Sequence, residues 1–409
     1  MQVVIEKKGG IFFLYRYTSL LLPSGRTTHS KFRIPMPTLD DSVCNITQGS
    51  DLAEFLKVTS LIIWNEAPMA HKFCFEALDK TLNDIMKISD NNDTVFRGKI
   101  VVFCGDFRTI LPMIPRGTHS DIVHTTINAS YLWSHCHVLK LTKNLRLQSN
   151  SDTTHATEVT NFAKWILQIG DGTLGQANDG YGTIEIPKEL FILNYTDPID
   201  AIVQSTYPNI RQHYKDSKFL QPRAILASTK EIVDHINDYV LSLIPSEERE
   251  YLSSDSIEKS DTIESEGFST ITTEFINSLS TSRLPNHKIK LKVDSRIMLL
   301  RNLDQNEGLC NSTRLIITRF ADHIIEAKIM SGKGQGNTVY IPRLATSPSQ
   351  SPWPFKLIRR KFPIIVSYAM TINKSQGQLL ASVGLYLPTP VFSHGQLYVA
   401  LFRCKTKMD

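Results

Sequence analysis

The chain has 409 residues, a length that accommodates two or three domains. Hydrophobic residues make up 41% and charged residues 21%, which argues against a disordered chain and for a globular protein with a substantial core. The net charge of +5 permits a polyanionic partner without requiring one. No apolar run approaches the ~18 residues of a membrane span, so we expect no transmembrane segment.

The cysteine pattern predicts a reducing, intracellular location. None of the six cysteines forms a C-x-x-C pair, and they are too few for a disulfide scaffold of this size. The run His135-Cys136-His137 predicts a strand with Cys136 on the opposite face from both histidines, which favours a structural role over a metal site. An apolar run at residues 11–15 lacks a signal-peptidase site and predicts a core strand.

The stretch at residues 61–68 organises the first half of the chain. Large apolar residues predict a buried parallel strand that ends in Asn65 and Glu66 and stops at Pro68, with a helix over residues 71–86. Open α/β sheets place their ligands at this end of a strand. Nucleotide hydrolases hold Mg²⁺ there with an Asp, followed by a Glu that orients or activates water. An amide cannot supply that negative charge, so Asn65 gives a site of the right shape and the wrong charge.

Other elements of the first half fit the same fold class. We expect a helix over residues 51–60, a strand over 99–103 that ends in Cys104-Gly105-Asp106, and a strand over 138–141. Strands that alternate with helices predict a parallel α/β domain. The hydroxyl, His, aromatic and cationic residues at 27–35 suggest a strand along a sugar–phosphate backbone with a base-stacking ring, and a solvated loop is the alternative.

The second half contains a second α/β unit and a β-rich insertion. A strand is expected at 224–227 and a helix at 229–243, and the Ser-, Thr- and Glu-rich stretch 246–282 predicts an exposed, partly disordered excursion. Short β segments predict a small β-barrel-like insertion over 290–343. Buried strands are expected at 362–370 and 383–387, and a helix at 393–403.

Two further features suggest phosphate binding. Residues 371–378 follow a strand and are expected to open a helix that Ser375 caps, where backbone N–H groups and Lys374 suit a phosphate; an ordinary capped turn is the alternative. Arg146 and Arg403 lie at the ends of predicted elements in different halves of the chain. In motor ATPases two arginines from separate domains converge on one γ-phosphate in this way. A surface ion pair is the alternative for each arginine. No phosphate loop G-x-x-x-x-G-K-[ST] occurs in the chain.

The ordered motifs together resemble the Pif-one-type (petite integration frequency) DNA helicases of superfamily one, in particular the plant branch associated with Helitron transposons. The resemblance covers nearly the whole chain. Its carriers are Ser24-Gly25-Arg26-Thr27-Thr28-His29-Ser30, Trp64 to Met69, Gly105-Asp106-Phe107-Arg108 with Leu111-Pro112, Leu141-Thr142-Lys143-Asn144-Leu145-Arg146-Leu147, Gly308-Leu309-Cys310-Asn311, Ala369 to Gln378, and Pro390 to Leu401.

The resemblance implies ATP-driven 5′-to-3′ movement on single-stranded DNA with duplex unwinding, in repair, recombination, telomere maintenance or Helitron transposition. The implied partner is single-stranded or forked DNA. It implies two RecA-like domains, a barrel inserted in the second, the cofactors ATP and Mg²⁺, and a nuclear location. Glu66, Arg146 and Arg403 would be catalytic, and Asn65 and Asp106 would stand at the metal. The remaining implied contacts are Asn65, Asp106, Thr109, Gln376 and Gly377 at the nucleotide, and Thr27, His29, Ser30, Phe32, Lys374, Ser375 and His394 along DNA.

Several positions depart from the family pattern. The loop, a helix of about 12 residues and a strand of about 5–6 are missing between Tyr17 and Thr18, which is expected to expose neighbouring core. Asn65 replaces the metal-binding Asp and Thr109 replaces a Gln that senses the γ-phosphate. Cys104 replaces a Gly, and Phe402 replaces a small residue. We therefore expect little or no ATP hydrolysis.

The predicted organisation is an α/β chain of two RecA-like domains. The first, truncated domain spans 1–147, and the second spans 148–289 and 344–409 around the insertion at 290–343. Three hypotheses remain: an ATP-dependent DNA helicase, a non-hydrolysing single-stranded-DNA-binding protein, and a decayed transposon remnant without a stable fold.

Overall fold

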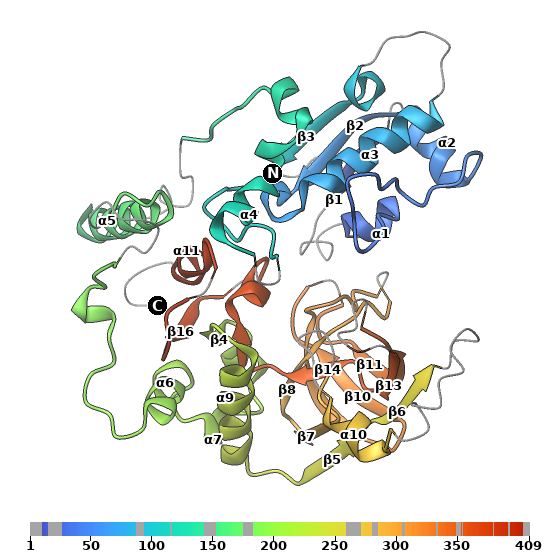
Figure 1. Ribbon diagram of the computed structural model, residues 1–409. Helices are drawn as coiled ribbons and strands as arrows, with labels where there is room; N and C mark the ends of the chain where they lie inside the picture. Colours follow the sequence, from blue (N-terminus) through green and yellow to red (C-terminus); the bar gives the residue numbers. More distant parts are fainter. Residues whose placement is uncertain are drawn as a thin grey trace. The chain divides into compact units, whose positions relative to one another are not determined.

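A computed structural model describes most of the chain (Figure 1). The described residues are 10–14, 27–86, 94–114, 117–142, 153–174, 183–258, 271–279, 285–304, 307–332, 334–348, 353, 355–378, 380–391 and 393–403. Contacts divide the chain into two compact units, which are treated separately: Met1–Phe191 with Val391–Met408, and Ile192–Pro390.

The first unit is built on a three-stranded parallel sheet in the order β1-β2-β3. Its strands are β1 (Gly10–Leu14), β2 (Thr59–Asn65) and β3 (Ile100–Cys104). Its helices are α1 (Thr28–Phe32), α2 (Asp51–Val58), α3 (Lys72–Ile85), α4 (His119–His124), α5 (Thr153–Gly170) and α11 (Gln396–Phe402), with short 3₁₀ turns at Ala67–Met69, Val95–Gly98, Ile127–Ala129, Tyr131–His135 and Lys188–Leu190.

One face of this sheet carries the core of the first unit. The buried Trp64 ring lies 4.5 Å from the Phe75 ring of α3, measured between centroids. His71 caps α3 by accepting a hydrogen bond from the Phe73 N–H at 3.2 Å, and Met86 ends it. The predicted strand at the centre and the predicted helix over 71–86 are therefore confirmed.

The opposite face of β3 is open to solvent. Ile100 and Val102 are 64% and 40% exposed, although parallel sheets normally bury both faces. The expectation that a missing helix and strand expose neighbouring core stays a prediction.

The strand predicted over residues 138–141 is wrong. These residues are extended but pair with no strand among the described residues, and Leu139 and Leu141 are 83% and 101% exposed. Their apolar character gave the prediction, but a strand forms only where a neighbouring ladder is available.

The second unit contains a second three-stranded parallel sheet, in the order β15-β4-β16. The strands are β4 (Arg223–Ala227), β15 (Ala369–Thr371) and β16 (Ser382–Tyr386), and the helices are α6 (Pro198–Thr206), α7 (Ile210–His213), α8 (Ser217–Leu220), α9 (Lys230–Leu243) and α10 (Thr273–Ser278). Thr229 caps α9, and the buried Asn237 amide bonds the backbone of Val366 and Ala369 at 2.8–3.1 Å. The parallel α/β class is thus confirmed in both units.

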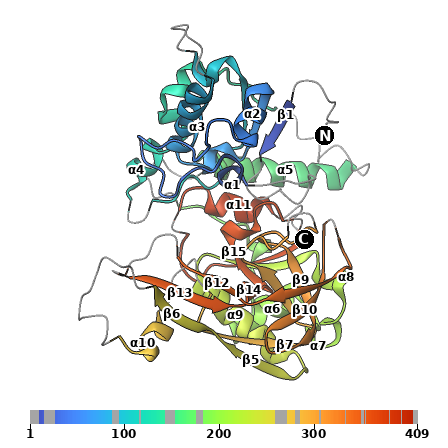
Figure 2. The ribbon, with the colours of Figure 1, turned by 90° about the vertical axis from the view of Figure 1, so that its right-hand side faces the viewer.

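The remaining strands of the second unit are antiparallel (Figure 2). They form sheets in the orders β11-β10-β9-β8-β14, β12-β13-β6 and β5-β7. The strands are β5 (Glu248–Leu252), β6 (Ser254–Glu258), β7 (Lys288–Lys292), β8 (Arg296–Leu299), β9 (Arg314–Phe320), β10 (Ile324–Ile329), β11 (Thr338–Pro342), β12 (Leu344–Thr346), β13 (Lys356–Lys361) and β14 (Ile364–Val366).

Two predictions for this region need correction. The ladders close no barrel within the described ranges, because the sheet that holds most of residues 290–343 ends at β11 and β14. The stretch predicted as an excursion instead forms β5, β6 and α10 in its described parts. Cross-strand ion pairs stabilise β5: Lys288 contacts Glu250 at 2.5 Å and Lys290 contacts Glu248 at 3.3 Å.

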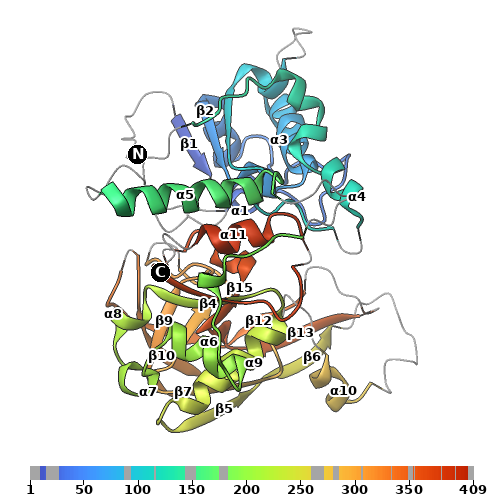
Figure 3. The same cartoon turned by 90° about the vertical axis from the view of Figure 1, so that its left-hand side faces the viewer.

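The two compact units do not coincide with the four predicted segments. The helices α5 and α11, both assigned from sequence to the second RecA-like domain, belong to the first compact unit, where they lie side by side (Figure 3). Within the described ranges, no helix has the length and apolar character needed to cross a bilayer.

Candidate active site

The carboxyl ends of β2 and β3 meet in the first unit, as the sequence predicts for parallel strands. The ladder sets Asn65 opposite Cys104. Glu66 follows in the left-handed backbone region, with φ of 55°, where a non-glycine residue is strained. A Cβ on Gly105 would stand 2.3 Å from Cδ of Pro68, so only glycine lets β3 approach this turn so closely.

Asp106 holds the loop after β3 through both of its carboxylate oxygens. Oδ1 accepts the backbone N–H of Arg108 at 3.0 Å and lies 3.5 Å from the Arg108 guanidinium. Oδ2 accepts the hydroxyl of Tyr398, on α11, at 2.9 Å. Burial and the Asp106 charge raise the pKa of Tyr398, so its hydroxyl stays protonated and donates.

The neighbouring Arg108 ties the same loop to α5. Its Nε lies 2.7 Å from Oδ1 of Asp171, and this hydrogen bond raises the pKa of Arg108. A Cβ on Gly170 would stand 2.6 Å from Cδ of Arg108 and 2.7 Å from the Tyr398 ring. The loop, α5 and α11 therefore meet in one tight contact.

The N-terminus of α11 closes on the same loop. A ring nitrogen of His394 lies 3.2 Å from the carbonyl oxygen of Phe107. Gly395 has φ of 70°, and a Cβ there would stand 2.4 Å from the carbonyl oxygen of Arg108. Thr109 donates its hydroxyl to the carbonyl oxygen of Asp106 at 2.6 Å, so this side chain is turned into the loop.

These residues do not fit a Mg²⁺–nucleotide centre. Asn65 offers a neutral amide where a carboxylate is needed, and both oxygens of Asp106 already accept hydrogen bonds. No group of three His, Cys, Asp or Glu side chains in the described part of the chain is placed to hold a metal. Asn65 therefore lacks the charge of the metal role expected for it, and the metal role expected for Asp106 stays a prediction.

The structure corrects the strand predicted over residues 27–35. Thr27 caps the short helix α1 by accepting from the Ser30 N–H at 3.4 Å. The Phe32 ring is fully buried, 6.1 Å from the Trp64 ring, so it is a core residue and cannot stack on a base. His29 lies 3.6 Å from the Cys74 sulfur, and Ser30 is exposed.

The helix expected at residues 371–378 is also absent. A 3₁₀ turn over Ile372–Ser375 follows β15, and the chain turns at Gly377, whose φ is 76°. The buried hydroxyl of Ser375 donates to the carbonyl oxygen of Ile372 at 2.7 Å rather than capping a helix. Burial lowers the pKa of Lys374 to about 8. The amide of Gln376, only 3% exposed, has no hydrogen-bond partner in the described structure.

The two arginines expected at the γ-phosphate remain predictions. Arg146 lies outside the described residues. Arg403 is half-buried at the C-cap of α11, and its backbone N–H bonds the carbonyl of Ala400 at 3.3 Å.

Sequence reasoning missed the partners of Asp106. Tyr398, which donates to Asp106, and Asp171, which pairs with Arg108 of the same loop, are both far from the loop in sequence. The unusual Gly170 and Gly395, which admit this close contact, were the only available signal.

Comparison with known proteins shows that the chain is similar to helicases. The model of the PIF1-like helicases matches residues 3–180, and the model of the 2B domain of DNA helicase Pif1 matches residues 274–320. Over these two segments the chain is similar to PIF1-like helicases. The second match covers α10, β7, β8 and most of β9.

Individual relatives agree with this family. "ATP-dependent DNA helicase PIF1" of Xenopus laevis is 31% identical over 126 residues, which are 29% of this chain and 18% of that protein. "ATP-dependent DNA helicase Pif1" of Campylobacter jejuni is 23% identical over 93% of this chain and 76% of that protein. The match to the Xenopus, zebrafish and human relatives thus spans under a fifth of their lengths.

Solved structures match the fold of nearly the whole chain. A Bacteroides Pif1 helicase in complex with ADP-AlF3 and ssDNA has a TM-score of 0.63 at 19% identity, over 99% of this chain and 82% of that one. Bacteroides Pif1 bound to ssDNA has a TM-score of 0.61 at 20% identity, over 98% and 81%. The RecA-like α/β fold predicted from the sequence is therefore confirmed.

Proposed function

We propose that this PIF1-like chain binds single-stranded DNA and hydrolyses ATP slowly or not at all. The observation that carries the proposal is the altered centre at β2 and β3. Asn65 replaces the metal-binding carboxylate, and Asp106 is held by Tyr398 and Arg108. Glu66, the expected water-activating base, has no charged metal site beside it.

The DNA-binding part of the proposal rests on different residues. Lys374, Ser375, His394 and the α1 residues Thr27, His29 and Ser30 match family stretches that lie along DNA. The net charge of +5 suits a polyanion, and the solved relative with a TM-score of 0.61 carries ssDNA. Phe32 is withdrawn from this set because it is buried.

The finer assignments belong to the same proposal. In a family member with full activity, Mg²⁺ and ATP would act with Glu66, Arg146 and Arg403, and Gln376 and Gly377 would adjoin the nucleotide; here the metal site is degenerate. The motif resemblance supports a 5′-to-3′ polarity, the plant Helitron-associated branch, the missing phosphate loop and a nuclear location.

The gap between Tyr17 and Thr18 fits either a skipped exon or a deletion, and transcript sequencing across it distinguishes them.

Fluorescence anisotropy with a labelled single-stranded oligonucleotide tests DNA binding, with salt titration to count phosphate contacts. We expect saturable binding, and we expect the logarithm of the binding constant to fall linearly with the logarithm of the salt concentration. A folded chain without such binding would contradict the proposal.

A second candidate is a decayed remnant. The exposed Ile100, Val102, Leu139 and Leu141 favour it, because uncovered apolar surface weakens a domain and promotes association. Cooperative thermal unfolding of a monomer would exclude this candidate.

A further inference from the structure

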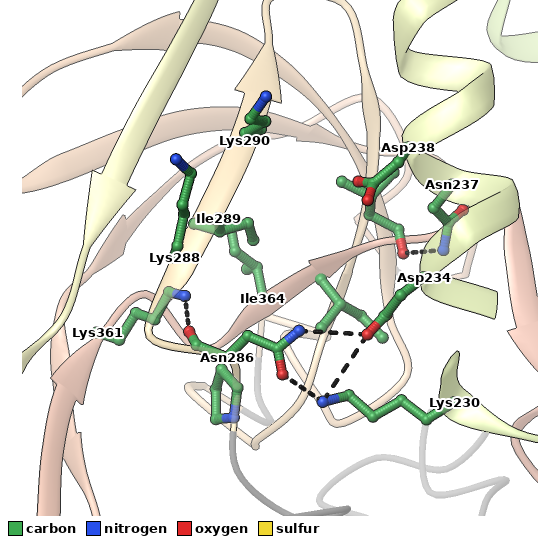
Figure 4. A pocket seen from close by; sticks show the side chains of 13 residues that line it. Lys230, Asp234, Asn237, Asp238, Asn286, Lys288, Ile289, Lys290, Lys361 and Ile364 are labelled. Atoms are coloured by element: carbon green, nitrogen blue, oxygen red, sulfur yellow. Dashed lines mark hydrogen bonds and ion pairs between the residues drawn. The ribbon is translucent and has the colours of Figure 1, made fainter. Parts of the chain in front are cut away.

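A cavity of about 320 Å³ lies in the second unit, between α9 and the strands β7, β13 and β14 (Figure 4). This volume greatly exceeds the ~10–15 Å³ that a single water requires. Six of its lining residues are charged: Lys230, Lys288, Lys290 and Lys361, with Asp234 and Asp238. The cavity is separate from the centre at β2 and β3, which belongs to the first unit.

Three of the four lysines already have a carboxylate partner. Lys288 and Lys290 pair with Glu250 and Glu248 on β5. Lys230 lies 3.9 Å from Oδ2 of Asp234. Their charges are therefore balanced by the protein.

Lys361 differs from these three. Its side chain is only 2% exposed, and its ammonium group donates to the carbonyl oxygen of Asn286. It has no carboxylate at ion-pair distance in the described structure. Asp255, the nearest acidic group on the adjoining strand, is occupied by Arg359 at 2.6 Å. A buried cation without a counter-ion is costly, and a bound anion would relieve that cost.

Asn286 connects the two walls of the cavity. Its carbonyl accepts Lys361, its side-chain oxygen accepts Lys230 at 2.5 Å, and its amide donates to Asp234 at 3.2 Å. Lys230 and Lys361 thus extend toward one point from α9 and β13 (Figure 4). Two ammonium groups on the wall of one cavity, both donating to Asn286, suit a compact oxyanion.

We propose that this cavity binds a small oxyanion of the phosphate class, held by Lys361 and Lys230. The anion accepts the hydrogen bonds that the two ammonium groups otherwise donate to the Asn286 oxygens. Asp234 remains bonded to the Asn286 amide. The same chemistry is offered by free phosphate and by the phosphates of a polynucleotide.

Titration of the whole chain with inorganic phosphate by calorimetry, at constant ionic strength in chloride, tests this proposal. Lys361→Met removes the unbalanced charge and keeps the volume of the chain, a change that buried sites often tolerate. We expect its dissociation constant to rise about tenfold or more. The matched control is Lys356→Met, since Lys356 is an exposed residue of the same strand that pairs with Glu258.

Lys230→Met, on the opposite wall, provides a second variant if Lys361→Met fails to fold. We expect it also to weaken phosphate binding, by several-fold. Equal affinity in the wild type and in either folded lysine variant would overturn the proposal, as would no binding by the wild type at millimolar phosphate. Adding a short single-stranded oligonucleotide then identifies the source: displacement of phosphate indicates a polynucleotide, and undisturbed binding indicates a free anion.

Discussion

The hydroxyl of Tyr398 and the carboxylate of Asp106, 292 positions apart in the chain, are joined by a hydrogen bond of 2.9 Å. This contact anchors the C-terminal helix α11 on the loop after β3. In relatives with full activity the Asp106 position is implied to lie near metal and phosphate. Here its carboxylate has a structural partner, the Tyr398 hydroxyl.

Tyr398→Phe removes this hydrogen bond and keeps the ring. Because the acceptor is charged and partly exposed, we expect the free energy of unfolding to fall by about 1–2 kcal/mol in urea titration. Tyr340→Phe is the control, since the Tyr340 side chain is 63% exposed. Equal stability of the two variants would mean that the Tyr398 hydroxyl does not hold α11.

Gly395→Ala tests the close packing of α11 on the loop. The added Cβ would meet the carbonyl of Arg108 at 2.4 Å, and the left-handed backbone adds strain. Gly172 has a similar φ of 65° but open space around its Cβ position, so Gly172→Ala isolates the backbone term. That term is roughly 1–2 kcal/mol.

We expect thermal unfolding of Gly395→Ala at a clearly lower temperature than that of Gly172→Ala. Matching unfolding temperatures would show that α11 can move away from the loop at no cost.

Lys361 predicts a pH dependence of stability. Burial is the main cause that lowers the pKa of Lys361 to about 7, and the positive charges of Arg359, Lys230 and Arg343 lower it as well. The negative charge of Asp255 acts in the opposite direction and raises this pKa. The unfolded chain keeps the usual pKa of 10.5 and binds more protons between these values. The contribution of Lys361 to stability therefore rises with pH from about 7 to 10.5 and is most unfavourable below pH 7.

Denaturant unfolding of Lys361→Met in phosphate-free buffer measures this effect. Below pH 7 the variant should be more stable than the wild type. Since one unit of pKa shift corresponds to ~1.4 kcal/mol, we expect a difference in the free energy of unfolding of about one to several kcal/mol. The difference should shrink as the pH rises toward 10. A constant difference over this range would contradict the assigned titration.

The elements that sequence predicted best are long and bury one clear face. The helices α3 and α9 follow from apolar spacing and from the caps His71 and Thr229, and β2, β3 and β4 follow from short apolar runs. Their parallel direction follows from the α/β alternation.

The elements that sequence missed depend on distant partners. β5 was assigned to an excursion because its residues are charged, yet Glu248 and Glu250 meet the lysines of β7 some forty positions later. Residues 138–141 have strand composition and no ladder within the described structure. Phe32 was placed on DNA because its neighbours are polar, whereas the fold buries its ring against Trp64.

The candidate site divides in the same way. Asn65, Glu66 and Asp106 were placed at the strand ends from spacing alone, and the structure puts them there. The hydrogen bonds that occupy Asp106 come from α11 and from its own loop, and no local pattern predicts which side chain a distant helix presents.

Restoring the metal-binding charge alone should not restore a motor. Asn65→Asp supplies one carboxylate, but the chain has no G-x-x-x-x-G-K-[ST] loop and Asp106 remains bonded to Tyr398. We expect no measurable ATP turnover from this variant in a coupled assay, at any DNA concentration. Measurable turnover would show that the defect lies at Asn65 and not in the phosphate-binding segment.

The most direct measurement is phosphate release from ATP by the purified, folded chain, with and without single-stranded DNA. The proposed function predicts retained DNA binding with no DNA-stimulated turnover. DNA-stimulated phosphate release would contradict it and would mean that another segment of the chain replaces the phosphate loop.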